Sequence, residues 1–242
     1  VMPSHAKFTA ARMTHDGQEW LRDASIEARF AIAAHRREQA AGIDKLLFTD
    51  AQLDLDGATA ALAVAMGADG KVSVKTMPGK GSAHARLDFA RGVLRPGSAV
   101  RWKMPLSSTN AQGVAHLDSF DAQFEVDRDM RLRARVPPQA GGVLGLDTDL
   151  VIRGNQVPLR DFASLLPRTS GHVEGRWRFS TLHWLGRFFT KAPWLALDGA
   201  GDVAADVQVV DGKVAAGSTF GVPDVAVVAE VMGNRINGRG RA

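Results

Sequence analysis

The feature that most constrains this chain is the alternation of apolar and polar residues in several segments. Residues 26–32, 47–55, 173–179 and 203–209 each place apolar side chains at every second position. Successive side chains of a β-strand point to opposite faces of a sheet, so each segment offers one apolar and one polar face. Strands of this kind are typical of antiparallel sheets with one solvated face. The sequence therefore predicts a mainly β protein.

Turn signals separate these segments. Candidate turns are Asp56-Gly57, Ala68-Asp69-Gly70, Arg91-Gly92, Gly154-Asn155, Asp211-Gly212 and Gly233-Asn234. Glycine and asparagine supply the positive φ angles that tight hairpins need. The spacing therefore predicts meandering antiparallel strands.

Residues 124–136 are predicted to form a hairpin by themselves, with the turn at residues 127–129. Its polar face would set Glu125 and Asp127 across from Arg131 and Arg133. The run of Arg131, Arg133 and Arg135 could also bind an anionic lipid or a phosphate. Cross-strand pairing is the favoured interpretation, because matching acids are close by.

Two short stretches have a helical pattern. Residues 158–166 start with proline, space apolar residues at helical intervals and stop before Pro167; residues 181–189 show a similar spacing. The N-terminal part is ambiguous, with a strand favoured through Ile32 and an alanine-rich stretch beyond it. We divide the chain into a strand or helix segment (1–45), a first β module (46–156), and a helix with a second β module (157–242) continuous with the first.

Composition narrows the function classes. The 242 residues include 30 Lys and Arg against 26 Asp and Glu, a net charge of +4, and the basic residues are scattered. A nucleic-acid binder usually gathers them on one face among aromatic residues, so no nucleic-acid partner is expected. The absence of cysteine excludes disulfides, thiolate zinc sites and cysteine nucleophiles. No apolar run reaches the roughly 18 residues that span a bilayer.

The residues that could carry chemistry form no catalytic pattern. None of the 7 histidines has a metal-ligand spacing, and His84 and His172 fall on polar strand faces. The sequence shows no nucleophile elbow, phosphate-binding glycine loop, dinucleotide fingerprint or zincin motif. We therefore expect no enzyme activity, no catalytic residues, no metal and no cofactor.

An internal repeat is the most specific motif. Residues 85–98 align with residues 205–218. The identical pairs are Ala85/Ala205, Gly92/Gly212, Gly97/Gly217 and Ser98/Ser218. Each copy reads as a strand, a glycine turn, a short return and a glycine-serine bend. Related sheet modules would explain two copies, although antiparallel sheets also reuse such turns independently.

The rhythm of this repeat resembles that of a known family. Residues 197–218, together with the proline-bounded helix at 158–167 and the strand at 171–180, resemble the repeating β-groove proteins of the AsmA and TamB type. The resemblance covers most of residues 46–242. It implies a long curved sheet with an apolar channel in the periplasm, and a role in phospholipid transport or outer-membrane biogenesis. It also implies an inner-membrane anchor, which we expect upstream in a longer protein because this chain shows none.

From the alternation and the resemblance we expect a curved antiparallel sheet that forms an open groove or taco-like half barrel, with one or two short helices. Acyl chains of a phospholipid or another lipid would lie on the apolar concave face, since burial stabilises by about 0.8 kcal/mol per CH₂. The predicted lipid-binding residues are Leu53, Leu55, Trp177, Phe179, Val207, Val209, Trp184, Phe188 and Phe189. The last three would form an amphipathic plug with Trp194, unless these aromatic residues belong to a core.

Two alternatives stay open from the sequence. The apolar face could pack against a second sheet, as in a β-sandwich, because periodicity does not separate a filled core from a lined groove. The chain could also be a ligand-free structural or adhesive β-repeat segment of an envelope or secreted protein.

Overall fold

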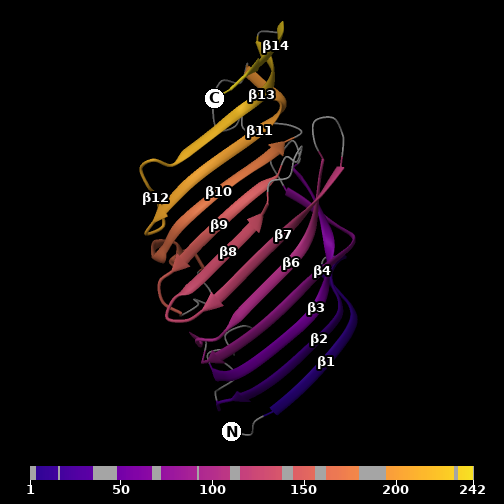
Figure 1. Ribbon diagram of the computed structural model, residues 1–242, viewed down its shortest axis with the longest axis vertical. Helices are drawn as coiled ribbons and strands as arrows, with labels where there is room; N and C mark the ends of the chain where they lie inside the picture. Colours follow the sequence, from indigo (N-terminus) through magenta and orange to yellow (C-terminus); the bar gives the residue numbers. More distant parts are fainter. Residues whose placement is uncertain are drawn as a thin grey trace.

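A computed structural model describes residues 4–15, 17–34, 48–66, 72–91, 93–109, 115–137, 144–155, 162–179, 195–231 and 234–241 of the chain. In this part, all strands belong to one sheet of 14 strands (Figure 1). Nearly all neighbours are antiparallel, and the strands follow one another in chain order except for the short β5 and β12. β1 and β14 lie at opposite ends of the long axis. The predicted mainly β fold with a curved antiparallel sheet is confirmed.

All strands except β5 and β12 are longer than the usual 5–6 residues. Their bounds are β1 Ser4–His15, β2 Gln18–Ile32, β3 Thr49–Met66, β4 Val72–Ala90, β5 Val93–Leu94, β6 Ala99–Thr109, β7 Ala115–Val126, β8 Met130–Val136, β9 Gly145–Ile152, β10 Thr169–Phe179, β11 Leu195–Val210, β12 Lys213–Val214, β13 Thr219–Val231 and β14 Asn234–Gly240. The 3₁₀ helix η3 covers Phe162–Arg168.

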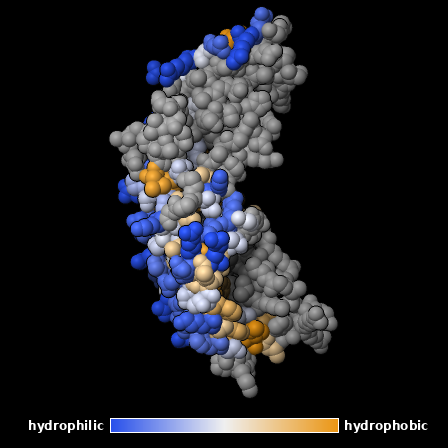
Figure 2. All heavy atoms as spheres, turned by 90° about the vertical axis from the view of Figure 1, so that its right-hand side faces the viewer, coloured by the Kyte–Doolittle hydropathy of each residue, from blue (hydrophilic) through white to orange (hydrophobic). Residues whose placement is uncertain are grey.

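The strand register gathers the alternating apolar residues on one face of the sheet. One row of directly opposed residues runs from β1 to β11 through Phe8, Ile26, Leu55, Ala85, Val100, Phe124, Leu132, Leu150, Gly171 and Val209. A row on the other face reads Asp56, His84, Arg101, Gln123, Arg133, Asp149, His172 and Gln208. In the side view, hydrophilic residues border one side of the sheet and hydrophobic residues lie next to them (Figure 2). The long strands from β1 to β11 thus add to one continuous apolar face.

The strand β6 changes partner where β4 turns away from it. β4 pairs with β6 only from Ser82 to Arg86, and beyond Lys103 the strand β6 pairs directly and in parallel with β3, Leu62 opposite Leu106. Gly81 lets β4 come this close to β3, because a Cβ at this position would lie 2.0 Å from Thr59 Oγ1. The end of β3 thereby comes to lie beside β6.

The sequence repeat is a structural repeat. Arg91 and Asp211 have left-handed φ angles of 50° and 51°, and Gly97 and Gly217 have φ angles of 92° and 88°. The hydrogen bonds also match: the Ser98 hydroxyl accepts from the Asp88 N–H at 2.9 Å, as Ser218 does from Gln208 at 3.0 Å. β5 and β12 are the matching short returns, which pair with β4 and β11.

The expected hairpin at 124–136 is confirmed. Val126 pairs with Met130 across a turn of residues 127–129, and Glu125 lies opposite Arg131 as predicted. Arg133 lies between Gln123 and Asp149 instead of facing Asp127. The acids that form ion pairs with the arginine run, Asp149 and Asp147, belong to β9.

Other predictions of local structure are wrong. Asp56-Gly57 makes no turn but lies within β3, where Gly57 pairs with Ala83. Among the described residues, the helix expected at 158–166 is the 3₁₀ turn η3, which begins at Phe162 and runs through Pro167. A 3₁₀ turn tolerates this proline better than an α-helix would, because its short run holds fewer backbone hydrogen bonds for the proline to break. The helix expected at 181–189 lies outside the described residues.

The start of the chain is also more regular than the sequence suggested. β2 ends at Ile32, which confirms the strand favoured there. The strand β1 was not foreseen, and it forms the edge next to β2. The expected boundary between the two β modules falls between β9 and β10, which are paired neighbours of the same sheet.

Candidate ligand-binding cavities

A cavity of about 500 Å³ lies on the apolar face toward the end of the sheet at which β3 meets β6. Its lining is almost entirely apolar and comes from β3, β6, β7, β8, β9, β10 and β11 and the residue before β9. The lining residues are Leu62, Met104, Leu106, Phe120, Val136, Leu144, Gly145, Leu146, Val173, Gly175, Arg176, Trp177, Val203 and Ala205. We call this the large cavity. Its volume falls in the range of small-molecule sites, roughly 300–1,000 Å³.

One wall of the large cavity is a packed cluster. Leu62, Met104, Leu106, Val136 and Leu144 are buried together, and Val136 is only 1% exposed. Met104 and Leu106 flank Pro105, which lies between the last residue of β6 that pairs with β4 and the first that pairs with β3. A strand tolerates proline where a neighbouring strand is interrupted, because less ladder pairing is lost there. The partner change thus brings Leu62 over this part of the apolar face.

The floor of the large cavity consists of small residues. Gly175 of β10 lies directly opposite Ala205 of β11 and Leu146 of β9. A Cβ built on Gly175 would have its nearest neighbour at 3.6 Å, an ordinary contact. The hollow therefore exists because glycine and alanine stand where larger apolar residues would fit.

A second apolar cavity, of about 330 Å³, lies between β2 and β6. It is lined by Trp20, Leu21, Leu55, Ala83, His84, Ala85, Val100 and Trp102. We call this the small cavity. Trp102 lines it and also packs against the cluster of Met104 and Leu62 that walls the large cavity. Trp102 therefore separates the two cavities.

The other end of the apolar face is filled. Leu94, Val126 and Met130 are buried there at 5%, 3% and 2% exposure, with Phe89, Ile152 and other partly buried residues around them. Leu165 of η3 packs on this cluster. The 3₁₀ turn thus closes the face at one end, and the cavities lie away from it.

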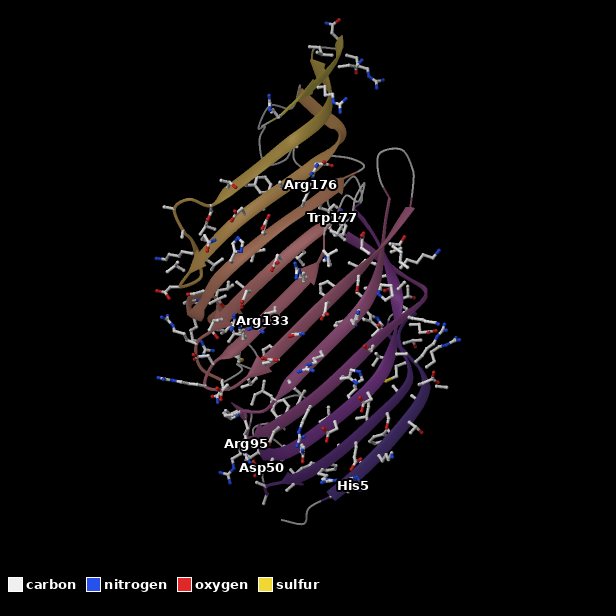
Figure 3. All side chains as sticks on the ribbon, viewed as in Figure 1. His5, Asp50, Arg95, Arg133, Arg176 and Trp177 are labelled. Atoms are coloured by element: carbon white, nitrogen blue, oxygen red, sulfur yellow. The ribbon has the colours of Figure 1, made fainter. Side chains whose placement is uncertain are left out.

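The rim of the large cavity carries charge. Arg176 and Trp177 are neighbours on β10, so they belong to opposite faces of the sheet (Figure 3). Arg176 bonds to the carboxylate of Asp202, which is 4% exposed although the arginine side chain is 57% exposed. This pairing provides the compensation that a buried carboxylate requires.

Charge pairing dominates the polar face. Arg131 Nε donates to Asp149 Oδ1 at 2.8 Å, and Arg133 Nε lies 3.7 Å from Asp149 Oδ2. The hydrogen bond from Arg131 lowers the pKa of Asp149 below its ordinary value. The pKa of Glu27 is lowered in the same way by Arg29 and His5. The arginine run thus pairs across strands, as the sequence favoured.

Two histidines singled out from the sequence pair with carboxylates. His172 Nε2 lies 2.9 Å from Asp206 Oδ1, and His84 bonds to Asp56, both on the polar face. Within the described ranges, no group of three or more His, Cys, Asp or Glu side chains could hold a metal ion.

The structure places the predicted lipid-binding residues unevenly. Leu55 lines the small cavity and Trp177 the large one. Leu53, Val207 and Val209 lie on the apolar face but line neither cavity. Phe179 ends β10 opposite Gly201, and its side chain lies outside the described part, as do Trp184, Phe188 and Phe189.

Sequence reasoning missed most of the lining. It put Val173, Val203 and Ala205 on apolar strand faces. It placed Val136 on the apolar face of the hairpin at 124–136, but it did not identify Leu62, Leu106, Phe120 or Leu144. The period of two could have found Leu62, Leu106 and Phe120 as apolar-face residues. Only the strand order shows that they converge.

Comparisons with protein families, with curated proteins and with solved structures found no match for this chain. In the described residues, no helix has the length and apolar character needed to cross a membrane. The structure alone therefore defines the fold, which is one large, mainly antiparallel sheet whose apolar positions share a face.

Proposed function

We propose that this protein binds the acyl chains of a lipid on the apolar face of its sheet, with the large cavity as the main site. The observation that carries the proposal is a hollow of about 500 Å³ with an almost entirely apolar lining, at one end of an apolar face that crosses the sheet. Apolar surface of this kind gains stability when a guest excludes water from it. Acyl chains fit it, because each buried CH₂ contributes about 0.8 kcal/mol and needs no hydrogen-bond partner.

The architecture favours a bound ligand, and not a second layer of protein, as the cover of the apolar face. All strands of the described part belong to one sheet, so no second sheet covers the apolar face there. The β-sandwich alternative requires such a sheet. The polar face carries cross-strand ion pairs instead, such as Arg131 with Asp149, and suits contact with water.

The resemblance to groove proteins of the AsmA and TamB type extends this proposal to its setting. In that setting the protein acts in the periplasm of a bacterial envelope, in phospholipid transport toward the outer membrane. The acyl-binding proposal does not depend on this setting, since it rests on the cavity.

The direct test is mass spectrometry of an organic extract from purified protein. Lipid in about stoichiometric amount supports the proposal, and it should displace or be displaced by a fluorescent long-chain fatty acid. An extract without lipid, together with no binding of the fluorescent fatty acid, would reject it in favour of a ligand-free structural segment.

A matched pair of variants links binding to the cavity. Ala205 lines the large cavity, whereas Ala204 lies on the polar face opposite Arg176. Ala205→Phe fills the hollow and should reduce fatty-acid binding about tenfold or more, and Ala204→Phe should leave it nearly unchanged. Equal binding by both variants would show that the lipid, if bound, lies elsewhere.

A further inference from the structure

The two cavities lie on either side of one side chain of β6. Val100 and Trp102, successive apolar-face residues of this strand, line the small cavity. The next two apolar-face residues, Met104 and Leu106, line the large cavity. The Trp102 side chain also packs against the buried cluster to which Met104 and Leu106 belong. Trp102 therefore stands at the boundary between the two cavities.

The neighbours of Trp102 across the sheet are small. Trp102 lies directly opposite Ala83 of β4 and Ala122 of β7. The next residues of the same row are Gly57 of β3 and Ala134 of β8. The indole is the one large side chain in this stretch of the row. None of its neighbours in the row is therefore long enough to fill the space that the indole occupies.

The indole is held in place by Trp20 of β2. The centroids of the two rings lie 6.0 Å apart, a distance at which aromatic side chains attract one another. Trp20 lines the small cavity, but of the two tryptophans only Trp102 also packs against the cluster that walls the large cavity. The partition between the cavities is thus Trp102, and Trp20 supports it from the side of the small cavity.

The large cavity has a charged side and an apolar side. Arg176, the charged residue among its lining, belongs to β10, and β7, β8 and β9 lie between that strand and β6. The ionised end of a fatty acid stays in water or beside a cation, because burying a carboxylate is costly. An acyl chain in the large cavity would therefore have its polar end toward Arg176 and its methyl end toward Trp102.

We propose that Trp102 sets the length of the acyl chain that this protein accepts, because its indole closes the large cavity at the methyl end of the chain. The small cavity behind it is a space that a longer chain would enter if the indole were absent. This inference rests on the proposed acyl binding and names the feature of the ligand, its chain length, that the site selects.

The test is a series of saturated fatty acids with about 8 to 18 carbon atoms, each titrated by displacement of the fluorescent fatty acid. For the parent protein, the Kd should fall about fourfold for each added CH₂ until the chain fills the large cavity, and then level off. In Trp102→Ala the levelling should come about four carbon atoms later or more, since the small cavity adds about 330 Å³ to about 500 Å³. The longest acids should then bind Trp102→Ala about tenfold or more tightly than the parent.

The matched control fills the small cavity instead. Ala85 lines the small cavity and not the large one. Ala85→Phe alone should leave the levelling point of the parent unchanged, and combined with Trp102→Ala it should bring the levelling point back to that of the parent. Should Trp102→Ala lose the circular dichroism spectrum of the parent, Trp102→Leu takes its place, because it removes the indole but keeps an apolar side chain; its shift should be smaller and equally reversed by Ala85→Phe.

The outcomes separate this inference from the proposed function. Fatty-acid binding with the same levelling point in the parent and in the Trp102 variants would overturn the role of Trp102 and leave acyl binding standing. A shift that Ala85→Phe does not reverse would also overturn it, because the added carbon atoms would then lie outside the small cavity. Absence of binding for every fatty acid in the parent would reject the proposed function itself, and this inference with it.

Discussion

Trp20 of β2 and Trp102 of β6 are in contact, with their ring centroids 6.0 Å apart and their planes at 51°. β3 and β4 lie between these strands in the sheet. Because neighbouring strands are about 4.8 Å apart, three steps across a flat sheet would separate the two backbones by about 14 Å. Side chains stand roughly perpendicular to a sheet, so their meeting shows that the sheet bends toward its apolar face at this place.

This contact predicts how substitutions of Trp102 will act. Its indole N–H and that of Trp20 are buried with no hydrogen-bond partner in the described structure, so a phenylalanine loses no hydrogen bond. Trp102→Phe should change the free energy of unfolding by about 1 kcal/mol or less, and Trp102→Ala should lower it by about 3 kcal/mol because it merges two cavities. Denaturant titration measures both. Equal losses would mean that the indole N–H, not the ring, is what stabilises this site.

The close approach of β4 to β3 and β6 at Gly81 predicts that this position tolerates only glycine. A Cβ there would lie 2.0 Å from Thr59 Oγ1 and 2.4 Å from the Lys103 carbonyl oxygen, and Thr59 is 2% exposed. The backbone oxygen has little freedom to move, since Thr59 Oγ1 donates to it at 2.8 Å. Gly81→Ala should lower the free energy of unfolding by about 2–4 kcal/mol.

The matched control for this variant is Gly175→Ala. Its added methyl group would meet nothing closer than 3.6 Å, and the change also favours an extended backbone. Stability measured by denaturant titration should therefore be equal to or slightly above that of the parent protein. Equal behaviour of the two variants would contradict the described close approach.

The alternation of the sequence predicted much of this fold, because the period of two reports which residues share a face. Ile26 to Ile32 and Val173 to Phe179 lie in strands as expected, and their apolar residues share the predicted face. Asp56-Gly57 shows the limit of local signals: its turn tendency is overridden because residues 50–59 pair with β4 on one side and β2 on the other. Pairing on both edges outweighs the preference of one dipeptide.

The alternation of the sequence does not predict the cavities, for a different reason. Leu62, Phe120 and Trp177 lie on β3, β7 and β10 and meet only because β3 changes partner and the sheet curves. Alternation gives the face of each residue but neither its neighbours nor the bend of the sheet. Leu55 and Trp177 were placed at a cavity from their face alone, and Val207 and Val209 show that the same argument also selects residues that line none.

The pair of Arg131 and Asp149 predicts a pH-dependent contribution to stability. The pKa of Asp149 is lowered by the hydrogen bond from Arg131, so the contribution is present above the unfolded-state pKa of about 3.9 and is lost as the pH falls through the lower folded value. The side chains are 45% and 41% exposed, so solvent screening limits the effect to about 1 kcal/mol or less. Asp149→Asn should be less stable than the parent at pH 7 and equal to it at acid pH.

Thermal unfolding of both proteins between pH 7 and pH 2 measures this difference. Asp147→Asn is the control, because Asp147 Oδ2 lies 3.7 Å from Arg135 Nε and the pair is more exposed. Its effect at pH 7 should be smaller. A loss in Asp149→Asn that persists unchanged at acid pH would show that the amide disturbs packing and not an ion pair.

The two serines of the repeat allow burial to be compared for the same bond accepted from a backbone N–H. Ser98 and Ser218 each accept a backbone N–H, from Asp88 at 2.9 Å and from Gln208 at 3.0 Å, but Ser98 is 1% exposed under the β7–β8 hairpin and Ser218 is partly exposed. Ser98→Ala leaves a donor that water does not reach and should lower the free energy of unfolding by about 1–2 kcal/mol. Ser218→Ala should lower it by about 0.5 kcal/mol, since water can replace the hydroxyl.

Amide hydrogen exchange assigns these losses to their sites. Exchange at Asp88 should accelerate in Ser98→Ala and exchange at Gln208 in Ser218→Ala, because each serine bonds to one amide only. Equal losses in the two variants would mean that the hairpin over the first copy does not exclude water from it. The difference in burial between the covered first copy and the exposed second copy would then have no effect on stability.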